Sequence, residues 1–184
     1  MPDPQPTADP YALLGLEREF ALTRARIESA YLQRAAALHP DVSGLDPDEA
    51  ARASSDLNLA KHALLDPETR ANTLLALIGG PGKSEDKSLP DGFLMGIMEI
   101  RQQIEADLAR IKASGDESKR TEWEGWAENW RAVAIERVRA LFGAANDDPG
   151  TLAQLRTQLN AWRYIERLIE QLDPDYNPAQ ADFR

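Results

Sequence analysis

Three Asp-Pro dipeptides, at positions 9–10, 46–47 and 66–67, divide the first part of the chain into helical segments. Aspartate is a good N-cap residue because its carboxylate accepts hydrogen bonds from the free N–H groups of the first turn, and proline fits the first helical position. Thr23 supplies a further cap. Together these signals predict four helices, at residues 10–14, 24–38, 47–65 and 67–78.

The two long predicted helices each carry one apolar face. Their apolar residues recur every three or four positions, as residues on one side of a helix do. An antiparallel pair of such helices, accompanied by two short helices, forms a small all-α domain. The two faces consist of Ile27, Tyr31, Ala35 and Leu38 in the first long helix, and Ala50, Ala53, Leu57, Ala60 and Leu64 in the second.

The first long helix runs into the tripeptide His39-Pro40-Asp41. Proline disfavours helical backbone at the residue before it, so the helix should stop there and leave the imidazole and the carboxylate at a bend. Short polar turns between helices normally face solvent, where such groups can bind a partner. The alternative interpretation is that Pro40 only ends the helix and Asp41 only occupies a turn.

A glycine-rich polar segment begins at Gly79 and shows no apolar periodicity. We interpret residues 80–90 as a linker between a first domain at 9–79 and a second at 91–174. Residues 1–8 are expected to form a disordered tail, and residues 175–184 a C-terminal tail. The glycines before Lys83 superficially resemble a phosphate-binding loop, but the preceding strand and the Lys-Ser/Thr pair of such loops are missing.

Beyond the linker, apolar residues recur at helical spacing in three long segments. The first follows Pro90-Asp91 and reaches about residue 113, the second follows Gly115-Asp116, and the third runs from Thr151 to Asp173-Pro174. This arrangement predicts an antiparallel three-helix bundle. The tryptophans lie at helical spacing, which indicates core packing rather than a cofactor site. The apolar faces include Phe93, Ile97, Ile100, Ile104, Leu108 and Ile111, then Trp123, Trp126, Trp130 and Val138, then Leu155, Trp162, Ile165, Ile169 and Leu172.

Four large residues of this bundle fall outside the apolar faces. At roughly 100° per residue, Leu94 lies roughly 90° from the centre of its helix's apolar face, Met98 roughly 130°, and Met95 almost opposite. Tyr164 points away from the apolar face of the last helix and is predicted to be exposed. Exposed methionine, leucine and tyrosine are typical of a docking patch. Leu94 and Met98 could equally cover the edges of the core.

Composition excludes several classes of function. The absence of cysteine rules out disulfides, thiolate zinc sites, cysteine-held iron-sulfur clusters and a cysteine nucleophile. The formal net charge of −10, from 31 acidic and 21 basic side chains, argues against nucleic-acid binding. The N-terminal residues show no signal peptide or presequence and no membrane-spanning segment occurs, so the bacterial cytoplasm is the expected location.

No constellation of residues predicts an enzyme. Of the two histidines, His62 has no carboxylate at metal-ligand spacing, so no metal site is expected. Neither a nucleophile elbow nor a dinucleotide-binding glycine motif occurs. We therefore expect a binding protein that needs no cofactor.

The first domain resembles the J-domain family of co-chaperones. The likeness rests on His39-Pro40-Asp41, on Leu57-Asn58-Leu59-Ala60 and on Leu64-Leu65-Asp66-Pro67-Glu68-Thr69-Arg70. It implies that this domain stimulates ATP hydrolysis by a seventy-kilodalton heat-shock chaperone of the HscA/DnaK class. In that family the tripeptide docks on the chaperone, and here Asp41 would reach an arginine network.

The same resemblance implies that basic residues of the helix before the tripeptide take part in docking, which here are Arg24, Arg26 and Arg34. J-domains usually carry more basic side chains on this helix and one directly after the tripeptide. This chain has Val42 after Asp41 instead. Because charges at an interface rim act mainly on the association rate, the thinned basic face predicts slower and weaker docking.

The second domain resembles the HscB family, also called Jac, of iron-sulfur co-chaperones. Two segments carry this likeness, Phe93-Leu94-Met95-Gly96-Ile97-Met98-Glu99-Ile100-Arg101 and Trp162-Arg163-Tyr164-Ile165-Glu166-Arg167-Leu168. It implies that the bundle binds an iron-sulfur scaffold protein of the IscU class through Leu94, Met98 and Tyr164, with Met95 and Arg101 nearby. Animal members can carry a zinc-binding cysteine tetrad, which this chain lacks, and Gly96 replaces an acidic or amide residue.

The sequence thus predicts an all-α co-chaperone made of a J-domain and an antiparallel three-helix bundle, without an active site of its own. Two alternatives stay open. The chain could be a J-domain co-chaperone for a different client, or a helical interaction protein whose J-domain has lost its chaperone. An enzyme is the least favoured class.

Overall fold

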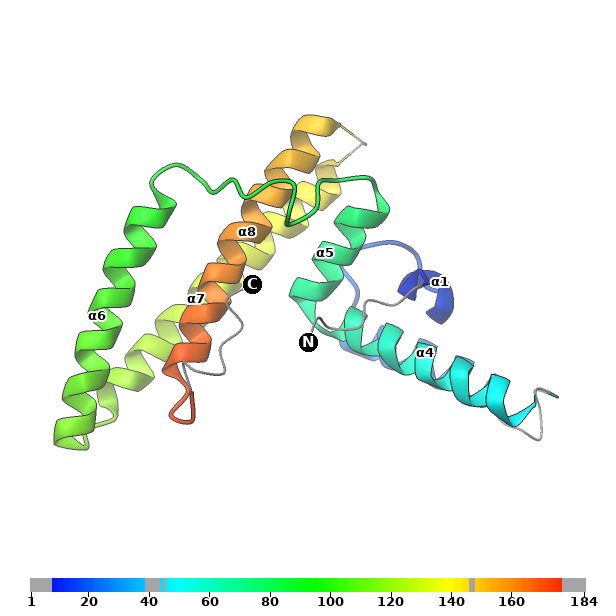
Figure 1. Cartoon of the computed structure of the whole chain (residues 1–184), viewed down its shortest axis with the longest axis horizontal. Helices are drawn as coiled ribbons and strands as arrows, with labels where there is room; N and C mark the ends of the chain where they lie inside the picture. The colour runs from blue at the N-terminus through cyan, green and yellow to red at the C-terminus, as the bar shows by residue number, and fades with distance from the viewer. Residues whose placement is uncertain (1–7, 39–43, 45, 146–147, 177–184) are drawn as a thin grey trace. The chain divides into compact units, whose positions relative to one another are not determined.

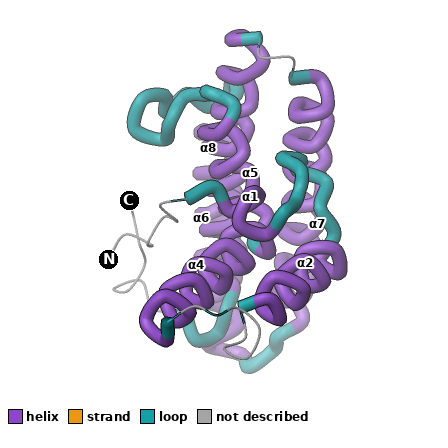
Figure 2. The backbone as a smooth tube through the Cα atoms, turned by 90° about the vertical axis from the view of Figure 1, so that its right-hand side faces the viewer, coloured by secondary structure: helices purple, strands orange, loops and turns teal. Residues whose placement is uncertain are grey.

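The structure is a computed structural model that describes residues 8–38, 44, 46–145 and 148–176, and all regular secondary structure in these residues is helical (Figure 2). The chain divides between Gly80 and Pro81 into two compact units, which are coloured from blue to blue-green and from green to red in Figure 1. The predicted all-α fold is therefore confirmed. None of the described helices is both long and apolar enough to cross a membrane.

The first unit contains the four helices that the capping signals predict: α1 (Pro10–Leu14), α2 (Arg24–Ala37), α4 (Pro47–Leu65) and α5 (Pro67–Leu77). Helices α2 and α4 pack against each other. Between them, the Tyr31 hydroxyl donates to Asn58 Oδ1 at 2.9 Å and Lys61 Nζ lies 4.3 Å from the centre of the Tyr31 ring. The core of this unit includes Tyr11, Leu14, Phe20, Leu22, Ile27, Leu57, Ala60, Leu64, Ala71, Leu74 and Leu75.

Each of the three predicted Asp-Pro signals caps a helix. The carboxylates of Asp9, Asp46 and Asp66 accept hydrogen bonds from backbone N–H groups in the first turns of α1, α4 and α5. A further Asp-Pro pair at 148–149 starts the last helix, where the sequence prediction placed the first helical residue at Thr151. The predicted start is two residues late, because Pro149 already occupies the first helical position and Gly150 lies within the first turn of the helix.

This last cap gives a pH-dependent expectation. Hydrogen bonds from the Thr151 N–H and hydroxyl, at 2.8 and 2.9 Å, hold the pKa of the Asp148 carboxyl below its usual value. The ionised carboxylate therefore stabilises the fold above the unfolded-state pKa of about 3.9, and this contribution disappears as the pH falls through the lower folded-state pKa. Because asparagine also caps helices but does not titrate, Asp148→Asn should lose less thermal stability than the parent protein below about pH 4.

Melting curves recorded by circular dichroism from neutral to acid pH would measure this difference. Asp175→Asn, which alters a carboxylate beyond the end of the last helix, is the control for lowering the overall negative charge. Identical pH dependence in the parent protein and in Asp148→Asn would contradict the expectation.

The second unit consists of α6 (Phe93–Ser114), α7 (Ser118–Ala144) and α8 (Pro149–Leu172). Contacts between side chains show that neighbours in sequence run in opposite directions. Trp123 Nε1 of α7 donates to Asp107 Oδ2 of α6 at 3.0 Å, while Arg131 Nε of α7 donates to Glu166 Oε1 of α8 at 2.8 Å. Helix α6 begins at Phe93 with Gly92 as its N-cap, directly after the Pro90-Asp91 pair that the sequence places before this helix.

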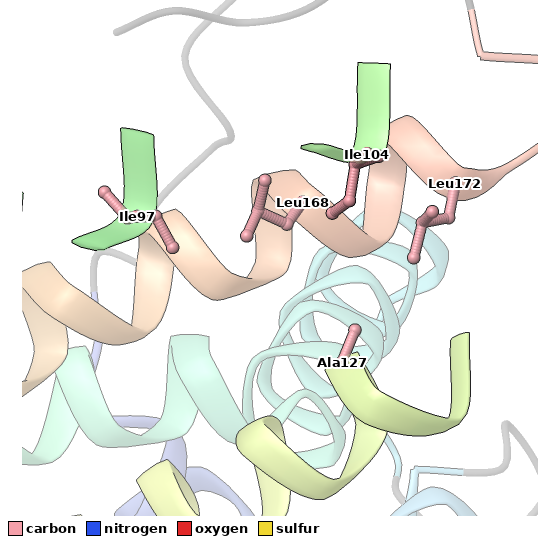
Figure 3. Close-up of a cluster of buried hydrophobic side chains, with 5 residues drawn as sticks. All are labelled: Ile97, Ile104, Ala127, Leu168 and Leu172. Carbon is pink, nitrogen blue, oxygen red and sulfur yellow. The ribbon is translucent and has the colours of Figure 1, made fainter. Parts of the chain in front are cut away.

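Residues from all three helices meet in the core of this unit (Figure 3). Helix α6 buries Ile97, Ile104 and Ile111, which are seven residues apart, whereas Phe93 and Ile100 are half-buried. A seven-residue repeat keeps one narrow line of a helix in contact with its partners. The central cluster consists of Ile97, Ile104, Ala127, Leu168 and Leu172.

The tryptophans divide into two groups. Trp162 of α8 is 1% exposed, and its Nε1 donates to Glu166 Oε1 at 2.5 Å. Trp123, Trp126 and Trp130 form a half-buried row along α7, with neighbouring ring centres 5.5 and 4.8 Å apart. The row continues to Phe93 of α6, whose ring centre lies 5.8 Å from that of Trp130. These contacts confirm that the tryptophans serve packing.

Polar contacts join α7 to α8 at two levels. The Arg131 guanidinium binds the Glu166 carboxylate with two of its nitrogens, and hydrogen bonds to Glu166 raise the pKa of Arg131 above its usual value. Nearer the end of α8, Arg120 Nη1 donates to the Leu172 carbonyl at 2.6 Å and so satisfies a carbonyl that the helix leaves free. These contacts therefore fix the position of α7 along α8, in addition to the apolar packing between the two helices.

Candidate functional site: an apolar groove between α6 and α8

A groove lies between the start of α6 and the second half of α8. Helix α6 contributes residues one turn apart along its side, and helix α8 contributes the positions that face them. The chain then returns beside the groove at Tyr176, just past the end of α8. The groove is lined by Leu94, Ile97, Met98, Arg101, Tyr164, Arg167, Leu168, Glu170, Gln171 and Tyr176.

The groove brings together four of the five predicted client-binding residues, which are Leu94, Met98, Arg101 and Tyr164. The side chains of Leu94 and Met98 are 47% and 56% exposed, so of the two interpretations left open for them, exposure is confirmed. Met95 is 69% exposed but does not line the groove. Its position on the far side of α6 follows from the helical angle.

The predicted exposure of Tyr164 was wrong. This side chain is half-buried against the central cluster of the bundle, and its ring meets the Phe93 ring edge-on at 6.1 Å between centres. The physical reason is that α8 contacts α7 on one side and α6 on another, so the flank opposite its main apolar face is covered as well. Tyr164 therefore forms part of the groove's floor rather than a free anchor.

Sequence reasoning missed the other α8 positions of the groove. Arg167, Leu168 and Gln171 follow Tyr164 at spacings of three, four and seven, which places them on the same flank of the helix. This periodicity was available in the sequence once Tyr164 had been singled out. Tyr176 carried no such signal, because it lies beyond the helix where no period applies.

Positive groups border the apolar floor. The Arg167 guanidinium lies 5.9 Å from the centre of the Tyr164 ring. Arg101 Nε donates to Glu105 one turn further along α6 at 2.9 Å, and Glu170 forms an ion pair with Arg163 at 3.1 Å. A surface with an apolar centre and charged groups at its edge is typical of protein-binding sites.

Gly96 lies on α6 between the groove residues Leu94 and Met98, and a Cβ atom added there would meet no atom within 4 Å. Alanine at this helical position should therefore raise the free energy of unfolding by up to about 1 kcal/mol. Urea unfolding followed by circular dichroism measures the change. The reciprocal control is Ala106→Gly, at an exposed position of the same helix, which should lower stability. An unchanged or lowered stability of Gly96→Ala would contradict this reasoning.

The second predicted binding surface lies on the first unit. His39, Pro40 and Asp41 are outside the residues that the structure describes. Of the three arginines predicted to assist them, Arg24 forms an ion pair with Glu28 at 3.0 Å, and Arg26 forms one with Glu19.

The third arginine, Arg34, is exposed near the end of α2, and its guanidinium lies against Gly15, the residue in left-handed conformation that ends α1. Leu32, two residues earlier on the same helix, is 65% exposed. Two of the three arginines are paired with carboxylates of their own unit, which partly neutralise their charge. The electrostatic attraction of α2 for an acidic partner is therefore weaker than the number of its arginines indicates.

Groups of side chains that could bind a metal ion were sought in the described residues. Among the residues that the structure describes, no three histidine, aspartate or glutamate side chains are grouped so that they could hold a metal ion. His62 is an exposed residue near the end of α4.

Comparisons with known proteins identify relatives of both units. Residues 9–73 match the DnaJ domain. The chain is 29% identical over 169 residues to the co-chaperone protein HscB homologue of Bordetella pertussis, and this alignment covers 89% of this chain and 94% of the relative. It is 33% identical over 121 residues to the HscB homologue of Chromobacterium violaceum, and that alignment covers 63% of this chain and 69% of the relative. The crystal structure of human co-chaperone protein HscB has the same fold, with a TM-score of 0.71 at 23% identity over 92% of this chain and 82% of that one.

Proposed function

Because the chain belongs to the HscB family of co-chaperones and begins with a DnaJ domain, we propose that it delivers an iron-sulfur scaffold protein of the IscU class to a seventy-kilodalton heat-shock chaperone. Membership of a co-chaperone family makes it a binding protein rather than an enzyme. The chaperone is the partner that a J-domain implies, and the scaffold is the client that we assign to the second unit. The bacterial relatives support the cytoplasm as its location.

The observation that carries the client assignment is the groove between α6 and α8. Leu94 and Met98 expose about half of their surface and line the groove together with the half-buried Tyr164. Exposed apolar groups around an aromatic residue are the composition expected where a protein partner buries them. Methionine and leucine adapt their rotamers to the partner's surface.

The chaperone assignment uses the other end of the chain. His39, Pro40 and Asp41 follow the last turn of α2, where Asp41 is proposed to bind an arginine of the chaperone. With one site on each unit, binding of the client places it near the chaperone at a raised effective concentration. This linkage is how a protein without an active site accelerates the productive encounter of two others.

The direct test is the steady-state ATPase rate of the seventy-kilodalton chaperones of the source organism, measured with and without this protein and with the scaffold present or absent. We expect the protein to raise the rate of one chaperone and the scaffold to raise it further. Stimulation without any effect of the scaffold would instead indicate a J-domain co-chaperone for another client.

The second candidate function is a binding module whose J-domain no longer engages a chaperone. The ion pairs of Arg24 and Arg26, together with exposed Leu32, favour it because they weaken the basic face of α2. Binding of the scaffold by folded protein, with no stimulation of any chaperone, would select this candidate over the first.

A further inference from the structure

The segment that follows the first unit is held on helix α8 by side-chain hydrogen bonds. Arg156 Nε donates to the Pro81 carbonyl at 2.8 Å. One turn further along α8, Asn160 Nδ2 donates to the carbonyls of Asp86 and Ser88, both at 3.0 Å. Three backbone carbonyls of one connecting segment are thus bound by two side chains of the same helix.

Burial and local turns add to this attachment. Arg156 is only 2% exposed, which is unusual for an arginine and shows that the segment covers it together with the bundle. Within the segment, Glu85 accepts from the Gly82 N–H at 2.7 Å, and Asp86 Oδ1 accepts from the Ser88 N–H at 2.7 Å. These turns present the carbonyls that Asn160 binds. We call residues 81–88 the strap.

Little chain remains between the strap and the first unit. Helix α5 ends with backbone hydrogen bonds from the Gly79 N–H to Ala76 and from the Gly80 N–H to Leu75, at 3.1 and 2.8 Å. The next residue, Pro81, is already bound by Arg156. The last hydrogen bond of the first unit and the first of the second are therefore on adjacent residues, although the glycine-rich sequence alone predicts a linker over residues 80–90.

We propose that Arg156 and Asn160 are positioning residues for the co-chaperone, which keep the strap on α8 and so restrict the connection between the J-domain and the client groove to a short hinge at Gly79 and Gly80. The attachment itself stands on the contacts above, and its role in client delivery rests on the proposed function. Helix α8 carries both the strap contacts and one wall of the groove.

The expected effect follows from the length of free chain. If the strap is released, the free connection grows from about two residues to about 13, and its root-mean-square span rises to roughly 20 Å. Effective concentration falls as about the −3/2 power of length, which corresponds to a decrease of roughly tenfold.

Releasing the whole strap requires both contacts to be lost, because Arg156 alone would still bind Pro81. Both Asn160 variants are therefore made together with Arg156→Gln, whose shorter side chain does not reach the Pro81 carbonyl. The main variant is Asn160→Asp, which keeps the shape of the side chain but replaces its donor by a carboxylate facing two carbonyl oxygens. Asn160→Ala, which removes the donor without adding charge, is the second variant. The matched control is Gln154→Glu, the same amide-to-acid change at an exposed position of the same helix. Circular dichroism melting shows whether each variant is folded.

The first measurement does not depend on function. Hydrogen exchange read by mass spectrometry should be faster in peptides covering residues 81–90 of Asn160→Asp and Asn160→Ala, and unchanged in Gln154→Glu. Because the chain has no cysteine, Ser55→Cys and Lys112→Cys give unique labelling sites, one on each unit. Single-molecule energy transfer between them should show a broader distance distribution when the strap is released.

The second measurement titrates the co-chaperone into the chaperone ATPase assay. With saturating scaffold, the concentration giving half-maximal stimulation should rise by up to about tenfold in both Asn160 variants while the maximal rate stays the same. Without scaffold, the titration should not change, because the J-domain itself is intact. A role in folding alone would alter both titrations together.

These measurements distinguish the attachment of the strap from its effect on client delivery. Unchanged hydrogen exchange and unchanged distance distributions in both Asn160 variants would contradict the claim that these side chains hold the strap on α8. Faster exchange with an unshifted titration, in a system that the parent protein stimulates, would overturn its positioning role. If the parent protein stimulates no chaperone, the proposed function fails, and a broadened distance distribution still supports the hinge.

Discussion

Asp41→Asn is expected to weaken chaperone engagement by about 10- to 100-fold. A charge-assisted hydrogen bond contributes about 1.5–3 kcal/mol, and each 1.4 kcal/mol corresponds to about tenfold in affinity. Asparagine keeps the size and turn preference of aspartate but presents only one acceptor oxygen to an arginine fork, so the loss falls on the contact rather than on the fold. The measurement is the stimulated ATPase rate as a function of co-chaperone concentration.

The matched control is Asp46→Asn, five residues later at the N-cap of α4, where asparagine caps as well as aspartate does. It makes the same change of charge at a nearby position in the sequence. Equal loss of stimulation in Asp41→Asn and Asp46→Asn would show that overall charge, rather than the Asp41 carboxylate, determines docking. Full stimulation by Asp41→Asn would remove the tripeptide from the mechanism.

The double variant Leu94→Ala/Met98→Ala should weaken scaffold binding by roughly 30-fold or more, since residues that anchor an interface cost about 2 kcal/mol or more when truncated. Both side chains line the groove from α6 and are about half exposed in the free protein. Because they contribute little to the core, their truncation should leave the melting temperature nearly unchanged. Isothermal titration calorimetry with the scaffold gives the affinity.

Met95→Ala is the internal control for this prediction. Met95 is the neighbour of Leu94 and is more exposed, at 69%, but it lies outside the groove. It should bind the scaffold with an affinity within a few-fold of the parent protein. If Met95→Ala weakens binding as much as the double variant does, the client contacts the outer face of α6 and the groove is not its site.

The fold was predictable from the sequence because its signals are local. An Asp-Pro pair acts through the first turn of its own helix, so Asp9, Asp46 and Asp66 could be assigned without knowing what the helices pack against. The apolar periodicity of α6 likewise predicted a six-residue apolar face, and the three residues that the helix buries, Ile97, Ile104 and Ile111, all belong to it. The fold therefore follows from residues whose role depends on near neighbours in the chain.

The groove could be predicted only in part, because its shape depends on how α6 crosses α8. The angular position of Leu94 and Met98 on their own helix was enough to predict that they are exposed. The environment of Tyr164 depends on Phe93, which lies 71 positions earlier in the chain, and no periodicity in α8 contains that contact. The same holds for the strap, where the glycine-rich composition favours a free linker and the residues that bind it, Arg156 and Asn160, are about 75 positions away in the chain.

All four tryptophans of the chain lie in the second unit, and Trp130 touches Phe93, which in turn touches Tyr164 on the floor of the groove. Light of longer wavelength than the tyrosine absorption band excites tryptophan alone, so the resulting fluorescence reports on the bundle only. Far-ultraviolet circular dichroism reports on the helices of both units. One denaturant titration followed by both signals separates the unfolding of the two units without any added label. Occupancy of the groove can be followed optically in the unmodified protein through the row of indole rings that begins at Trp130.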